Sequence, residues 1–214
     1  MADTLRITEI FYSLQGEANT VGIPTVFIRL TGCPLRCNYC DTAYAFSGGE
    51  KREIADIISE VRRYNTRYVT VTGGEPLAQP GCHSLMRQLL ELGYLVSLET
   101  SGALDVSGVD SRVVKVMDLK TPSSGEMSRN LYQNLDSLTA IDQLKFVIAD
   151  ENDYQWSKQQ LLEKNLHERC QILFSPVMGQ LSPTELADWI LADQLPVRFQ
   201  IQLHKYLWND AKGK

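Results

Sequence analysis

Short apolar runs alternate with amphipathic helical segments along most of this chain. The runs predict seven strands, at residues 23–30, 68–72, 95–99, 112–119, 144–149, 171–174 and 197–203. Apolar residues recur at helical spacing between them, at residues 53–64, 83–92, 153–165 and from 182 onward. Such alternation is typical of a parallel sheet whose strands are joined by right-handed helical crossovers.

The length of the chain limits how far such a sheet can close. A complete eight-fold barrel takes about 250 residues, whereas this chain has 214. Some predicted strands are also joined by segments without a clear helical pattern. We therefore predict an α/β fold, an incomplete TIM-like (β/α) barrel of parallel strands, formed as a single domain over residues 1–214.

Composition and charge narrow the possible function classes. The formal net charge is −5 and no run of Lys and Arg occurs, which argues against nucleic acid as the main partner. No apolar stretch approaches the ~18 residues of a membrane span. The start, Met1-Ala-Asp-Thr-Leu-Arg, lacks the apolar stretch of a signal peptide, so we expect a cytoplasmic protein.

Polar segments, three of which contain glycine, follow five of the predicted strands. In parallel α/β folds the loops after the strands meet at one face, which carries the reactive groups. We therefore expect one shared site built from residues 31–33, 72–76, 99–102, 118–120 and 174–176.

The first of these loops carries three cysteines, Cys33, Cys37 and Cys40, spaced as C-x3-C-x2-C. In a reducing compartment such a cluster is more often metal-binding than disulfide-forming. Iron–sulfur clusters usually take four thiolates, so three would leave one iron open to a ligand. The alternative is a structural zinc site, which needs a fourth N or S ligand. That ligand would have to come from one of the distant residues Cys82, His83, His167, Cys170 or His204.

The cysteine spacing resembles the signature of the radical SAM superfamily. The aromatic Tyr39 before the last cysteine fits that signature, and residues 72–76 (TGGEP) resemble the second motif of the superfamily. The resemblance implies a [4Fe-4S] cluster whose open iron is bound by S-adenosyl-L-methionine (SAM). Reductive cleavage of SAM would then yield a radical that abstracts hydrogen from a substrate.

Flanking motifs resemble one family more closely, the 7-carboxy-7-deazaguanine synthases. They lie at residues 11–17 (FYSLQGE), 27–29 (FIR), 32–34 (GCP), 40–42 (CDT), 99–102 (ETSG) and 203–207 (LHKYL). The resemblance implies a carbon–nitrogen lyase of queuosine biosynthesis. It would contract the ring of 6-carboxy-5,6,7,8-tetrahydropterin to 7-carboxy-7-deazaguanine and release ammonia. It further implies Mg²⁺, a flavodoxin- or ferredoxin-type electron donor and a homodimer.

The resemblance also implies roles for individual residues. The pterin would contact Leu14, Gln15, Gly16, Arg29 and Thr72. SAM would contact Tyr39, Cys40, Asp41, Gly74, Glu75, Asp118, Leu119, Lys120, Phe174, Ser175, Pro176 and Val177. Arg29 suits a carboxylate because guanidinium and carboxylate form a bidentate pair. Thr42 would be a magnesium ligand, with substrate and water completing the shell.

Simpler interpretations of these residues stay open. By position alone Thr42 is a helix cap, Arg29 a charge at a strand end, Lys120 a salt-bridge partner of Asp118, and residues 174–177 a plain turn. Two other functions also stay open, a glycyl-radical activase and a non-catalytic iron–sulfur or zinc protein. The sequence assigns no role to Cys82, Cys170, His204 or residues 208–214.

Overall fold

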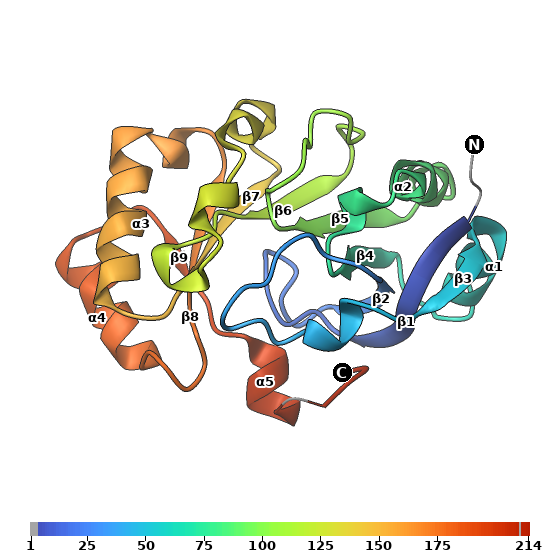
Figure 1. The fold of residues 1–214 in the computed structure, drawn as a ribbon, viewed down its shortest axis with the longest axis horizontal. Coiled ribbons are helices and arrows are strands. Elements are labelled where there is room, and N and C mark those ends of the chain that lie inside the picture. Colours follow the sequence, from blue (N-terminus) through green and yellow to red (C-terminus); the bar gives the residue numbers. More distant parts are fainter. Residues whose placement is uncertain (1–3, 210) are drawn as a thin grey trace.

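The structure is a computed structural model that describes residues 4–209 and 211–214. One nine-stranded sheet runs through the described residues in the order β3-β1-β2-β4-β5-β6-β7-β8-β9 (Figure 1). The strands are β1 Thr4–Leu14, β2 Pro24–Leu30, β3 Glu50–Glu53, β4 Tyr68–Gly73, β5 Leu95–Thr100, β6 Val114–Asp118, β7 Gln143–Ile148, β8 Gln171–Pro176 and β9 Arg198–Phe199.

Every neighbouring pair from β2 to β9 is parallel, as the alternating pattern predicts. The two ends of the sheet, β3 and β9, are separate in the strand order, so the sheet stays open. Two crossovers, from β5 to β6 and from β6 to β7, contain no α-helix; the second is built from three short 3₁₀ turns between residues 122 and 137. The prediction of an incomplete barrel is confirmed.

Four helices connect strands and cover the outer face of the sheet (Figure 1). They are α1 Ile54–Val61, α2 Gly81–Glu91, α3 Glu151–Glu163 and α4 Pro183–Ala192. The apolar positions of α1 that predicted a helix are the ones it buries. Helix α2 packs on β5, α3 on β7 and α4 on β8. In the described part of the chain, no helix is long and apolar enough to cross a membrane.

The sequence pattern missed two strands and overextended a third. Strands β1 and β3 pair antiparallel to form one edge of the sheet, with Thr4 opposite Glu53. At the other edge, the predicted strand 197–203 is reduced to Arg198–Phe199. The Leu203 amide donates to the Gly16 carbonyl, which turns the chain off the sheet edge and into helix α5, Leu203–Trp208.

The core holds both isolated cysteines. Cys82 is 0% exposed and Cys170 is 7% exposed, among apolar side chains of the main core. Burial raises the pKa of the Cys82 thiol to about 12. Both residues therefore act as small hydrophobic side chains.

Candidate active site

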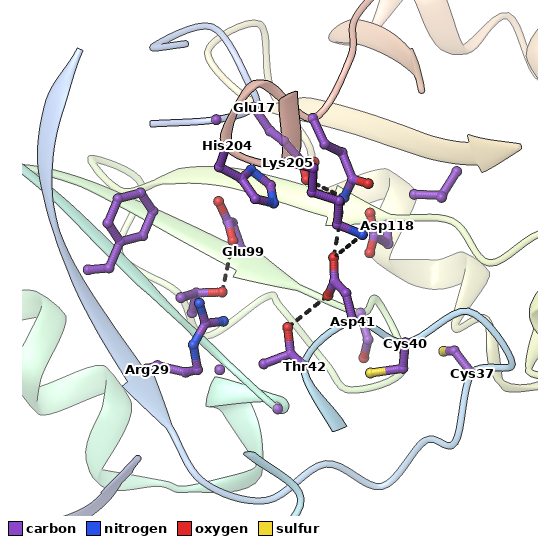
Figure 2. Close-up of a pocket in the computed structure, with 18 of the residues that line it drawn as sticks. Glu17, Arg29, Cys37, Cys40, Asp41, Thr42, Glu99, Asp118, His204 and Lys205 are labelled. Carbon is purple, nitrogen blue, oxygen red and sulfur yellow. Dashed lines mark hydrogen bonds and ion pairs between the residues drawn. The ribbon is translucent and has the colours of Figure 1, made fainter. Parts of the chain in front are cut away.

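The loops at the carboxyl ends of the parallel strands surround one cavity (Figure 2). Most of the residues singled out from the sequence line it: Leu14, Gln15, Gly16, Arg29, Cys33, Cys37, Tyr39, Cys40, Asp41, Thr42, Thr72, Gly74, Asp118, Lys120 and Val177. Five other predicted residues do not line the cavity and are buried: Glu75, Leu119, Phe174, Ser175 and Pro176. The expectation of one shared site therefore agrees with the structure for most of the predicted residues.

The cysteine loop forms part of the cavity wall, and its three cysteines line the cavity and are partly exposed. The guanidinium of Arg36 donates to the carbonyls of Cys33 at 2.7 Å and Leu35 at 2.6 Å. The amide of Asn38 donates to the Ser124 carbonyl at 3.0 Å. The loop is thus held both internally and by the β6–β7 connection.

The thiols suit an iron–sulfur cluster better than a single ion. Among residues 4–209 and 211–214, no three His, Cys, Asp or Glu side chains come together closely enough for one metal ion. A structural zinc needs four such ligands around one centre. In a cubane each thiolate binds its own iron, so the thiols need only share one cavity. Burial raises the pKa of Cys33 and of Cys37, and iron would supply the positive charge that keeps these thiols deprotonated.

The turn at Gly73 and Gly74, at the end of β4, is hydrogen-bonded to the backbone that leads into the cysteine loop. The Gly74 amide donates to the Leu30 carbonyl at 3.0 Å, and the Glu75 amide donates to the Gly32 carbonyl at 2.7 Å. A Cβ on Gly74 would lie 2.2 Å from the Gly32 oxygen. Only glycine allows this approach of the two backbones.

Glu75 turns its side chain away from the cavity. Its carboxylate is 0% exposed. It accepts hydrogen bonds from the Thr100 hydroxyl at 2.9 Å, the Ser101 amide at 2.7 Å and the Leu77 amide at 3.1 Å. The side chain therefore anchors the Gly-Gly turn to the end of β5, and only the backbone of this turn faces the cavity.

Alternating charges form the floor of the cavity. Lys145 contacts Glu17 at 2.5 Å and Asp118 at 3.3 Å, and Lys120 contacts Asp118 at 2.7 Å. Burial alone would raise the pKa of Asp118, but Lys120 and Lys145 hold it below its usual value. Burial alone would lower the pKa of Lys145, but Asp118 and Glu17 raise it well above its usual value. All four groups are therefore charged at neutral pH.

Glu99, at the end of β5, is a cavity residue to which the sequence assigned no role. Its carboxylate accepts hydrogen bonds from the Thr72 hydroxyl at 2.8 Å and the Gln15 amide at 3.3 Å. Burial raises its pKa, even though Lys145 acts in the opposite direction. The available signal was its place at a strand end, within the ETSG segment at residues 99–102.

The C-terminal motif reaches the same cavity (Figure 2). Lys205 pairs with Asp41 at 2.9 Å, and the Asp41 carboxylate accepts the Thr42 hydroxyl at 2.8 Å. Burial would raise the pKa of Asp41, but Lys205 holds it far below its usual value. His204 packs on Gly16, where an added Cβ would lie 2.1 Å from the imidazole Nδ1.

Residues 211–214, beyond this motif, also line the cavity. The Lys212 ammonium lies 4.5 Å from the centre of the Tyr44 ring. The segment after α5 therefore contributes to the wall beside Tyr44.

Known proteins resemble this chain in sequence and in fold. The family profile of the radical SAM superfamily matches residues 27–118. The fold matches the crystal structure of QueE from Escherichia coli with a TM-score of 0.78 and 23% identity, over 94% of this chain and 95% of that one.

Relatives named 7-carboxy-7-deazaguanine synthase match over nearly their whole length. The Chlorobaculum tepidum protein is 46% identical over 98% of this chain and 97% of its own. The Koribacter versatilis protein is 40% identical over 98% of this chain and 100% of its own. With these relatives and the superfamily profile, the chain belongs to the 7-carboxy-7-deazaguanine synthase family of radical SAM enzymes.

Proposed function

We propose a role for individual residues of this cavity in the reaction of the family. The enzyme contracts the ring of 6-carboxy-5,6,7,8-tetrahydropterin to 7-carboxy-7-deazaguanine in queuosine biosynthesis, using a [4Fe-4S] cluster and SAM. The observation that supports these roles is that the two sides of the cavity carry different chemical groups. The cysteine loop lies at one side, while Arg29 and Glu99 offer a cation and a carboxylate to a substrate at the other (Figure 2).

Cys33, Cys37 and Cys40 would each bind one iron. The bound cluster and SAM supply the radical that abstracts hydrogen from the pterin. Gly74 lines the cavity next to the cysteine loop, so its backbone can contact SAM beside the cluster. Lys120 can contact the carboxylate of SAM. Asp118 lies 2.7 Å from the Lys120 ammonium and holds it in place.

Other proposed SAM contacts differ in how directly the structure supports them. Tyr39, Asp41 and Val177 line the cavity. Tyr39 is held by a 3.2 Å hydrogen bond with Thr121. The remaining members of the set are buried and do not line the cavity, so the structure gives no direct support for their contact with SAM: Glu75, Leu119, Phe174, Ser175 and Pro176.

Arg29 would bind the carboxylate of the pterin, since a guanidinium matches a carboxylate with two parallel hydrogen bonds. Glu99, Gln15 and Thr72 form a connected group that can hydrogen-bond the N–H edge of the ring. The backbone of Leu14 and Gly16 completes this wall. Burial raises the pKa of the Glu99 carboxyl group, which shifts it toward its protonated, hydrogen-bond-donating form.

Thr42 would hold Mg²⁺ together with oxygens of the substrate and water. Its hydroxyl oxygen lines the cavity beside the Asp41 carboxylate. Mg²⁺ keeps several waters and often uses only one or two protein ligands, so this donor set fits an ion that binds together with the substrate. Held by both Mg²⁺ and Arg29, the pterin carboxylate would be fixed in one orientation.

The wider proposal follows the family. The chain would act as a single domain of residues 1–214, as a homodimer, in the cytoplasm, reduced by a flavodoxin- or ferredoxin-type protein. A glycyl-radical activase would need room for a protein substrate, whereas here the polar groups converge on a site with the dimensions of a small molecule.

The direct test is a turnover assay with anaerobically reconstituted enzyme, SAM, dithionite, Mg²⁺ and the carboxy-tetrahydropterin. We expect 7-carboxy-7-deazaguanine and ammonia in equal amounts. Enzyme with a complete cluster that cleaves SAM without forming this product would contradict the proposal.

A further inference from the structure

Arg29 is held from behind by a carboxylate that does not line the cavity. The Nε atom of Arg29 donates to Oε1 of Glu9 at 2.7 Å. Their side chains are 16% and 21% exposed, so the pair is largely shielded from water. Among the described residues, the Arg29 guanidinium donates a hydrogen bond only through Nε. Its two Nη atoms have no hydrogen-bond acceptor there.

An irregularity in β1 creates this pair. Ile7 lies opposite Leu30, but the next paired residue is Glu9 opposite Arg29, so Thr8 is extra on β1. Such a bulge shifts every later side chain of the strand to the other face. With regular pairing Thr8 would face Arg29; with the bulge, Glu9 does. Further along the paired strands β1 and β2, Phe11 stacks on Phe27, with 4.9 Å between the two ring centres.

Tyr44 fixes the carboxylate in turn. Its hydroxyl donates to Oε1 of Glu9 at 2.7 Å, the same oxygen that Arg29 uses. The Arg29 guanidinium carbon also lies 5.5 Å from the Phe11 ring centre and 5.8 Å from that of Tyr44. Two aromatic rings and one carboxylate thus hold the guanidinium on three sides.

We propose that Glu9 and Tyr44 are positioning residues that select which edge of Arg29 meets the substrate carboxylate. This inference rests on the proposed role of Arg29. Because Nε is occupied by Glu9, only the Nη1–Nη2 edge can form the bidentate pair. The carboxylate of Glu9 also offsets the charge of Arg29, so recognition depends on the direction of the guanidinium rather than on a net positive site.

The test compares two ligands in the reconstituted, SAM-bound enzyme. One is the 6-carboxy-tetrahydropterin, and the other is the tetrahydropterin without its 6-carboxylate. Glu9→Ala should weaken binding of the carboxylated pterin by about tenfold, as expected for loss of a charge-assisted hydrogen bond that orients the guanidinium. Affinity for the pterin without the carboxylate should stay within about twofold.

Three further variants keep the test decisive. Glu9→Gln retains an acceptor for Nε and should restore affinity to within about threefold of the wild type. Tyr44→Phe removes only the hydroxyl and should give a smaller loss, again confined to the carboxylated pterin. Glu50→Ala removes an exposed carboxylate from β3, opposite Ile7 of β1, and serves as the matched control.

An equal loss of affinity for both pterins in Glu9→Ala, or no loss for either, would overturn the inference. If Glu9→Ala does not fold, either of these results in Tyr44→Phe would overturn it instead. Wild-type turnover of the carboxylated pterin is measured in parallel. Its absence would contradict the proposed function, whereas normal turnover with ligand-independent losses in the variants would contradict only the roles of Glu9 and Tyr44.

Discussion

The Thr72 hydroxyl donates a 2.8 Å hydrogen bond to the carboxylate of Glu99, and both side chains line the cavity. The two residues end neighbouring strands, β4 and β5. The contact therefore follows from the parallel order of the sheet, which brings the ends of adjacent strands together. It fixes the carboxylate that we propose meets the pterin ring.

Glu99 should make stability depend on pH. Its pKa is raised by burial above the ordinary value of 4.5. Its contribution to stability is therefore greatest below that value and is lost as the pH rises through the native pKa. Replacing it with the uncharged Gln removes this loss. We expect the stability of Glu99→Gln relative to wild type to increase as the pH rises from 4.5 toward neutral.

Denaturant unfolding at several pH values measures this gain. The exposed Glu50 of β3 provides the control, because Glu50→Gln should show no such trend. A stability difference between Glu99→Gln and wild type that stays constant with pH would show that Glu99 does not titrate in this range.

Lys145 should be the most costly residue to remove from the charged floor. It contacts both Glu17 and Asp118, and its side chain is 12% exposed. Lys145→Met leaves two buried carboxylates without this cation, which should destabilise the protein by about 3 kcal/mol. Thermal unfolding checks this, with the exposed Lys51→Met of β3 as control. Equal melting temperatures for the two variants would contradict the role given to Lys145.

The Gly-Gly turn should be needed to assemble the cluster site. Gly74→Ala places a Cβ 2.2 Å from the Gly32 oxygen, so the turn and the cysteine loop must separate. We expect iron and sulfide content after reconstitution to fall to less than about half of the wild-type value. Gly108→Ala is the matched control, because its Cβ would meet only His83 at 3.6 Å. Full iron loading of Gly74→Ala would refute this coupling.

Thr42 should control the response to Mg²⁺. Thr42→Ala removes the hydroxyl oxygen from the cavity wall, so the stimulation of turnover by Mg²⁺ should be lost or shifted to about tenfold higher concentration. Thr42→Ser keeps the oxygen and should restore the response. A Mg²⁺ titration of the turnover rate measures both. An unchanged response in Thr42→Ala would exclude Thr42 as a ligand.

The parallel part of the fold could be predicted because its strands are buried on both faces. Such strands are nearly continuous apolar runs, as at Pro24–Leu30 and Gln171–Pro176. Their order then placed Cys33, Thr72 and Asp118 at one face without any structural information. The motif residues of the cavity followed from this placement together with the family resemblance.

The edges of the sheet could not be predicted in this way. Strand β3, Glu50–Glu53, is entirely charged and forms only because β1 offers it a ladder. The two-residue strand β9 ends early because the chain leaves to meet Gly16. In both cases a partner distant in sequence decides the local structure.

The direction in which individual side chains point could also not be predicted from the sequence. Glu75 belongs to a recognised motif, yet its carboxylate anchors Thr100 and Ser101 rather than lining the cavity. Glu9 faces Arg29 only because Thr8 forms a bulge. One extra residue in a strand changes which side chain meets the site, and no local pattern marks it.

The most direct test of the proposed reaction follows one hydrogen atom. Wild-type enzyme with a complete cluster is incubated with SAM, reductant, Mg²⁺ and carboxy-tetrahydropterin deuterated at C6, and the products are analysed by mass spectrometry. We expect 7-carboxy-7-deazaguanine together with deuterium in the 5′-deoxyadenosine released from SAM. Unlabelled 5′-deoxyadenosine without the deazaguanine product would contradict this reaction.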